Sequence, residues 1–229
     1  MKRHTLIAGI FTVLSLATAT LQAADQTTLY RARSGSKMRI EGTANIIHPT
    51  WQIESPIIGG WMEVGPGFPM EPGQTATLGK ISATNYVFLQ VRSLKSVKED
   101  GTHYDDRMDE VTWEHLKEAQ FKQIFYHLTE LTLKELPKTN GAPYVFEAKG
   151  DLTISGTTNT VTMLVNILPT TFRGEKALEV TGSVAVKMTD YKVAPVDINL
   201  VLGHIKTGDE VKLVFKWILG QQKAPAAAP

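Results

Sequence analysis

Histidines and carboxylates are the side chains of this chain that could carry acid–base or metal chemistry. The chain has six histidines, and His4 lies in the N-terminal segment described below. The remaining histidines are His48, His103, His115, His127 and His204. No two of them have the H-x-H, H-x-x-x-H or H-E-x-x-H spacing that brings two imidazoles to one metal ion. The histidine spacing therefore indicates no metal site.

One local cluster combines a histidine with acidic residues. His103, Tyr104, Asp105 and Asp106 are consecutive and precede a predicted helix. Acidic loop residues commonly stabilise turns or cap helices, so we interpret this cluster as a solvated turn. The chain also lacks a G-x-S-x-G nucleophile elbow and a glycine-rich phosphate loop. We therefore predict no catalytic residue, no metal and no cofactor, and we do not expect an enzyme.

The elements that would position functional side chains are strands, and a hairpin at 146–167 shows this most clearly. Its sequence is FEAKGDLTISGTTNTVTMLVNI. Apolar residues alternate with polar ones on both sides of a predicted loop at 156–160. Because successive strand side chains point to opposite faces, the pattern predicts two antiparallel strands with one buried face.

The same alternation recurs along most of the chain. We expect further strands at 37–46, 58–64, 81–94, 123–134, 180–188, 195–202 and 210–219. Since 81–94 is apolar on both faces, a helix at about 109–119 is expected to cover its outer side. We see no helix between consecutive strands that could serve as a parallel crossover. The pattern favours an all-β barrel or sandwich.

The N-terminus has the layout of a secretory signal peptide, predicted at 1–23. Lys2 and Arg3 precede an apolar run at 6–16, which is too short for a membrane anchor of about 20 residues. Cleavage is expected after Ala23 or Ala24. It leaves 22 of the 24 basic residues against 23 acidic ones, so the mature chain has no polycation for nucleic acid.

Cysteine is absent from the chain, so neither a disulfide nor a lipid-modified N-terminal cysteine can form. The mature protein is expected to be soluble, in a bacterial periplasm or secreted, and not a lipoprotein. Its 229 residues are 42% hydrophobic, enough for a substantial core.

Four segments carry a family resemblance. They are SKMRIEGTANIIHPTW at 36–51, MDEVTWEHLKEAQFKQIFYHLTELT at 108–132, the hairpin phrase GDLTI at 150–154, and KTGDEVKLVFKW at 206–217. In this order they resemble the YceI-like family of secreted lipid-binding proteins. The resemblance covers most of 36–219. The family commonly places a histidine and a tryptophan one residue apart, whereas Pro49 and Thr50 separate His48 from Trp51 here.

The resemblance implies a lipocalin-like antiparallel β-barrel of about eight strands at 36–219, with one short covering helix. It is followed by a disordered Ala/Pro tail at 220–229. The resemblance also implies an apolar cavity that holds an isoprenoid lipid or an isoprenoid quinone. The candidate lining residues are Met38, Phe146, Leu152, Ile154, Met163, Val165, Val184, Val186, Leu213, Phe215 and Trp217.

Alternation alone leaves two functions open, because the same residues can line a cavity or fill a solid core. In the first case the protein sequesters or carries an amphipathic isoprenoid, and a few polar groups at the mouth add specificity. In the second it is an envelope structural or interaction protein with a packed barrel and an outer patch around Trp61 and Phe68. The sequence also leaves a homodimer open.

Overall fold

The computed structural model describes residues 27–45, 50–200 and 203–222. The predicted signal peptide, His48 and residues 223–229 of the predicted tail lie outside this part of the chain.

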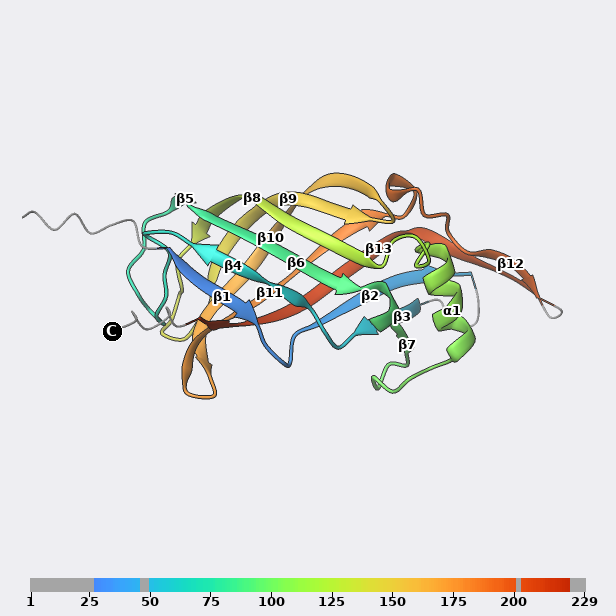
Figure 1. The fold of residues 1–229 in the computed structure, drawn as a ribbon, viewed down its shortest axis with the longest axis horizontal. Coiled ribbons are helices and arrows are strands. Elements are labelled where there is room, and N and C mark those ends of the chain that lie inside the picture. Colours follow the sequence, from blue (N-terminus) through green and yellow to red (C-terminus); the bar gives the residue numbers. More distant parts are fainter. Residues whose placement is uncertain (1–26, 46–49, 201–202, 223–229) are drawn as a thin grey trace, which may run out of the picture.

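The described chain consists mainly of strands (Figure 1). The strands are β1 (Thr28–Ala32), β2 (Lys37–Ala44), β3 (Thr50–Ser55), β4 (Gly59–Val64), β5 (Gly79–Ile81), β6 (Ala83–Gln90), β7 (Lys95–Val97), β8 (Gln123–Glu135), β9 (Tyr144–Ile154), β10 (Thr157–Phe172), β11 (Glu175–Lys187), β12 (Asp197–Leu200) and β13 (Gly203–Gln221). The helices are α1 (Asp106–His115) and the short 3-10 helices η1 (Val91–Ser93) and η2 (Thr189–Tyr191).

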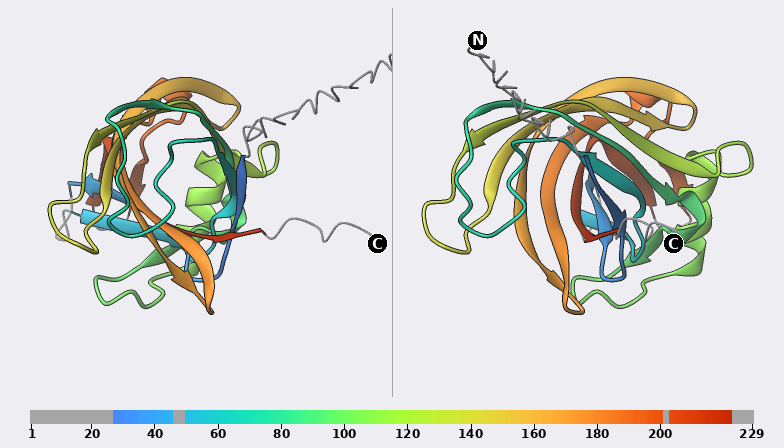
Figure 2. Two further views of the ribbon diagram at one scale, coloured as in Figure 1. Left: turned by 90° about the vertical axis from the view of Figure 1, so that its left-hand side faces the viewer. Right: turned by 60° about the vertical axis from the view of Figure 1, so that its left-hand side comes forward.

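The strands close into a ring, as Figure 2 shows in the view along the barrel. Neighbours follow the order β1, β4, β6, β8, β9, β10, β11 and β13, and β13 pairs again with β1. Near the α1 end, β2 and β3 continue the wall, because β2 pairs with β13 and β3, and β3 pairs with β7. The predicted antiparallel barrel is confirmed, with eight strands in the closed ring.

The hairpin at 146–167 is confirmed, but its loop is shorter than predicted. β9 and β10 are joined by Ser155 and Gly156 alone, with φ of 47° and 74°. A two-residue hairpin turn of this kind requires positive φ at both positions, and its twist matches that of the strands. Pairing therefore begins at once, with Thr157 opposite Ile154. The predicted loop residues 157–160 belong to β10.

The helix α1 overlaps the predicted range of 109–119, but it begins at Asp106 and ends at His115, so both of its limits come earlier than predicted. Asp105 is its N-cap and accepts a hydrogen bond from the Met108 N–H at 3.0 Å. Lys117, just beyond the helix, has φ 55°, which prevents its continuation. The capping role considered for the 103–106 cluster is thus confirmed at Asp105.

The position of α1 also differs from the prediction. It lies beside β7 at one end of the barrel (Figure 1), where the Trp113 Nε1–H donates to the Leu94 carbonyl at 2.9 Å. The outer side of β6 carries an aromatic cluster instead of a covering helix. Tyr86 contacts Phe88 and Phe125, with ring centroids 5.9 and 5.7 Å away. This cluster explains why 81–94 is apolar on both faces.

Two hydrophobic clusters fill the two ends of the barrel. One lies beneath the 65–78 loop, which crosses the end of the ring in the left view of Figure 2. The other lies toward α1, and Trp113 and Leu116 pack against it. Phe68 of the loop is buried in the first cluster and stacks on Phe146 with centroids 5.6 Å apart. The predicted outer position of Phe68 is therefore wrong.

The barrel extends beyond the predicted limits of 36–219. β1 precedes residue 36, and Tyr30 pairs with Gln221 in β13. Gly220 and Gln221 therefore belong to the barrel rather than to the tail. In the described residues, no helix combines the length and the apolarity that a membrane span requires.

Candidate ligand-binding cavity

A cavity of about 90 Å³ lies inside the barrel and is bordered by residues of both end clusters. The structure brings most of the predicted site residues to its wall. These are Met38, Leu152, Met163, Val165, Val184, Leu213, Phe215 and Trp217. They come from β2, β9, β10, β11 and β13, so alternation correctly predicts the faces that point inward.

Three predicted site residues do not line this cavity. Phe146 is fully buried in the cluster beneath the 65–78 loop, where it stacks on Phe68. Ile154 and Val186 lie in the cluster toward α1. All three point inward as predicted, but they lie near the barrel ends. Alternation predicts the face that a side chain occupies and carries no information on its height along the barrel.

The rest of the wall consists of residues that are not among the predicted site residues. The additional lining residues are Ile58, Met62, Asn85, Val87, Tyr126, Leu128, Leu131, Ala148, Val161, Ile167 and Val180. Asn85 and Tyr126 escape a search for apolar positions because they are polar. A period-2 signal could have found Asn85, since it shares a face with Val87 and Leu89.

Three of the lining residues carry polar atoms. The Asn85 Oδ1 accepts the Leu128 N–H at 2.9 Å, next to a bulge in β8. The Tyr126 hydroxyl and the Trp217 Nε1–H are buried and have no hydrogen-bond partner among the described residues. Burial raises the pKa of Tyr126, and the nearby Asp151 raises it further, so the phenol is neutral at physiological pH.

The wall of the cavity has no charged side chain in the described part of the chain. Met38, Met62 and Met163 contribute flexible thioether side chains, which adapt to irregular apolar shapes. Such a wall suits an uncharged, largely apolar guest. The arrangement offers binding rather than acid–base chemistry.

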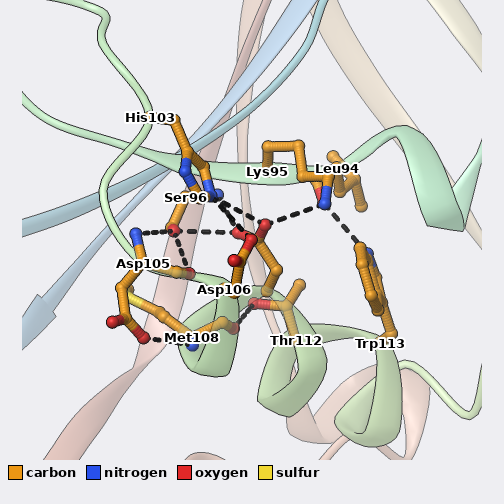
Figure 3. Close-up of polar contacts among 10 residues, drawn as sticks. Leu94, Lys95, Ser96, His103, Asp105, Asp106, Met108, Thr112 and Trp113 are labelled. Carbon is orange, nitrogen blue, oxygen red and sulfur yellow. Dashed lines mark hydrogen bonds and ion pairs between the residues drawn. The ribbon is translucent and has the colours of Figure 1, made fainter.

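The second candidate site is the His103 cluster between β7 and α1 (Figure 3). Its centre is Asp109, a fully buried carboxylate at the predicted start of the helix. Its Oδ1 accepts the Ser96 N–H at 2.6 Å and lies 2.8 Å from the Ser96 hydroxyl. Its Oδ2 lies 3.0 Å from Lys95 Nζ and 2.9 Å from His103 Nε2.

Burial alone would raise the pKa of Asp109, but the hydrogen bonds from Ser96, Lys95 and His103 outweigh it and lower the pKa. His103, Asp106 and Asp109 lie close enough to share a metal ion. A metal would have to displace the Lys95 ammonium, which already balances the Asp109 charge. We therefore interpret the cluster as a structural network of hydrogen bonds and ion pairs that holds the 98–105 loop and α1 against β7.

Solved structures with a similar fold include the following two. The crystal structure of Burkholderia cenocepacia BcnA has a TM-score of 0.51 and 15% identity, over 80% of this chain and 95% of that chain. A polyisoprenoid binding domain from Saccharophagus degradans, implicated in plant cell wall breakdown, has a TM-score of 0.54 and 10% identity, over 84% of this chain and 98% of that chain.

No curated protein matches the chain in sequence. The model of the YceI-like domain matches residues 72–218, which is more than half of the chain. This range contains β6 to β11 and nearly all of β13, so it supplies most of the barrel wall. The chain therefore belongs to the YceI-like family.

Proposed function

We propose that the protein binds an amphipathic isoprenoid lipid or isoprenoid quinone in the barrel cavity and carries or sequesters it without covalent chemistry. The apolar cavity enclosed by the ring of strands is the observation that carries this proposal. The family and the fold shared with a polyisoprenoid binding domain support it.

The affinity would come mainly from the removal of apolar surface from water, at about 25 cal/mol per Å². A branched, flexible isoprenoid chain fits a wall that has Met38, Met62 and Met163 among its aliphatic and aromatic side chains. The cavity volume of about 90 Å³ is below the roughly 300–1,000 Å³ of ordinary ligand pockets. Binding would therefore require the flexible wall residues to change rotamer.

We place this activity in the periplasm or outside the cell, on the basis of the N-terminal sequence. An isoprenoid lipid has a low solubility in water, so a barrel that encloses its chain would keep it dispersed between membranes.

Filling the cavity tests this proposal. Ala148 of β9 lies in the cavity wall, whereas Ala185 of β11 is exposed on the outer face. Ala148→Leu should weaken binding of farnesol about tenfold or more, because the added atoms occupy the space of the guest. Isothermal titration calorimetry measures this change, and binding to the parent protein should show a negative heat-capacity change.

Ala185→Leu is the matched control, since it adds the same atoms outside the barrel. It should leave farnesol binding unchanged. Equal affinities for the parent and for Ala148→Leu would place any bound lipid outside the cavity and contradict the proposal.

The second candidate function is a structural or interaction protein with a filled barrel. The small cavity volume and the packed clusters at both ends favour it. On this account farnesol does not bind, and Ala148→Leu lowers stability by overpacking, by about 1–3 kcal/mol. Calorimetry and urea unfolding of the same two variants thus distinguish the two functions.

A further inference from the structure

Oxidisable sulfur is concentrated in the cavity wall. Three of the seven methionines of the chain, Met38, Met62 and Met163, line the cavity, and the chain contains no cysteine. Oxidation of a thioether to a sulfoxide turns a flexible apolar side chain into a polar one. An oxidant that reaches these sulfur atoms therefore changes the polarity of the wall that a lipid would contact.

The three methionines differ in how accessible they are. Met62 is 3% exposed and lies in the cluster beneath the 65–78 loop. Met38 and Met163 are partly exposed, although both line the cavity. Hydrogen peroxide is only slightly larger than water, so it can reach side chains that water contacts. These two methionines are therefore the candidate sites of oxidation in the wall.

The surroundings of Met163 distinguish it further. Met163 of β10 faces Ala148 of β9, and Gly150 follows on the same face of β9. The end of the Tyr126 ring lies over Gly150, where a Cβ atom would be 2.6 Å from the hydroxyl oxygen. Diagonal positions on neighbouring strands are about 7–8 Å apart, a distance that long side chains span. Met163 is therefore a neighbour of the Tyr126 hydroxyl along the wall.

This hydroxyl favours an oxidised neighbour over a reduced one. It is buried and has no hydrogen-bond partner in the described part of the structure, which costs free energy. A thioether sulfur is only a weak acceptor, whereas a sulfoxide oxygen accepts hydrogen bonds strongly. A sulfoxide at Met163 would give the Tyr126 hydroxyl an acceptor, so the oxidised side chain would remain inside the barrel.

A sulfoxide in this wall would oppose the binding of an apolar chain. Such a chain makes no hydrogen bond, so its entry would remove water from the sulfoxide oxygen and offer nothing in return. The added oxygen atom would also occupy part of the cavity of about 90 Å³. Both effects lower the affinity for the guest.

We infer that Met163 is an oxidation site and that its sulfoxide weakens lipid binding, so that peroxide makes the barrel release its guest. The thioether sulfur attacks one oxygen of hydrogen peroxide, the S–O bond forms, and the O–O bond breaks. The departing hydroxide takes up the remaining proton and leaves as water. Sulfoxide reductases restore the thioether with electrons from a dithiol. This inference rests on the proposed function and adds a regulation of the same site.

Oxidation of the purified protein with hydrogen peroxide, followed by removal of the oxidant with catalase, tests the inference. Calorimetry should show that the parent binds farnesol about tenfold more weakly after this treatment. Mass spectrometry of its peptides should find one added oxygen atom on Met163. Met163→Leu preserves the apolar character and the approximate volume of the side chain. This variant should bind farnesol like the untreated parent, both before and after treatment.

Met108→Leu is the matched control. Met108 of α1 is also partly exposed, but it does not line the cavity. This variant should lose farnesol affinity on oxidation as the parent does. Met163→Gln introduces a lasting polar group at the same place and should bind farnesol about tenfold more weakly without any oxidant. In the parent, bound farnesol should slow the oxidation of Met163 and leave that of Met108 unchanged.

The outcomes separate the inference from the proposed function. Equal farnesol affinities before and after oxidation of Met163 would overturn the inference and leave lipid binding intact. So would a Met163 that stays unoxidised while Met108 reacts. Loss of the β-sheet circular dichroism signal in the oxidised parent would also overturn the inference, because the affinity would then fall through unfolding. An untreated parent that does not bind farnesol would overturn both.

Discussion

At the scale of single residues, Asp109 joins the 98–105 loop and α1 to β7 through four hydrogen-bonding contacts with Ser96, Lys95 and His103. Asp109→Asn should lower the free energy of unfolding by about 2–3 kcal/mol, because the Lys95 ammonium loses its counter-charge and an amide proton donor replaces an acceptor. Urea unfolding at pH 7 measures this loss.

Asp106→Asn is the control for this prediction. The Asp106 side chain is 90% exposed, so its replacement should change stability by less than about 0.5 kcal/mol. If Asp109→Asn were no more destabilising than Asp106→Asn, the network around Asp109 would contribute nothing to the free energy of unfolding.

The lowered pKa of Asp109 predicts a pH dependence with a defined sign. A carboxyl group whose pKa is lower in the folded state stabilises the fold above its ordinary pKa of about 4, and this contribution disappears as the pH falls through the lowered value. The difference in unfolding free energy between the parent and Asp109→Asn should therefore be constant near neutral pH and shrink in acid. Urea unfolding from pH 7 to pH 3 checks this, and a difference that grows in acid would contradict it.

The inward position of a residue could be predicted from the sequence, but its surroundings could not. Phe146 and Met163 both follow the alternation of the hairpin, yet Phe146 packs in an end cluster and Met163 lines the cavity. The difference depends on the 65–78 loop, which brings Phe68 onto Phe146. No local sequence pattern predicts the role of Asp109. Its partners Lys95, Ser96 and His103 belong to β7 and the 98–105 loop, and only the fold brings these segments to α1.

At the scale of elements, the 65–78 loop closes one end of the barrel. Phe68 anchors it from the inside, and the Tyr144 hydroxyl donates to the Gln74 carbonyl at 2.5 Å. Phe68→Ala should destabilise the fold by about 3–4 kcal/mol, because it leaves a cavity against Phe146. It should also accelerate exchange of a bound lipid by opening this end.

Thermal unfolding measures the loss of stability in Phe68→Ala. Stopped-flow displacement of bound farnesol measures the rate of lipid exchange. Leu78→Ala in the same loop is the control, since Leu78 is exposed and its truncation should alter neither quantity. An unchanged exchange rate in Phe68→Ala would show that the lipid does not pass this end of the barrel.

Element type was easier to predict than element boundaries. The long alternating segments at 123–134 and 210–219 are strands, as predicted, within β8 and β13. The short β1 and β3 were missed, since five or six residues give few alternations to detect. The hairpin loop was predicted too long, because Ser155 adopts a positive φ that is uncommon outside glycine, asparagine and aspartate.

At the scale of the whole molecule, closure of the ring determines what the protein can enclose. β1 pairs with β13, so both ends of the described barrel sequence meet at one seam. Closure leaves the ring without a free edge, and an eight-stranded ring has an interior that side chains can fill or that holds one small ligand. The fold could be predicted from the sequence, but the choice between these interiors depends on packing between strands that are far apart in the chain.

Lipid binding in the barrel is tested by native mass spectrometry of the protein, purified without detergent from cells that produce the full sequence. We expect a species heavier than the polypeptide, from which organic solvent extracts an isoprenoid lipid, and a smaller share of this species for Ala148→Leu than for Ala185→Leu. A parent protein that has only the mass of its polypeptide and yields no lipid would show that the barrel does not carry an isoprenoid.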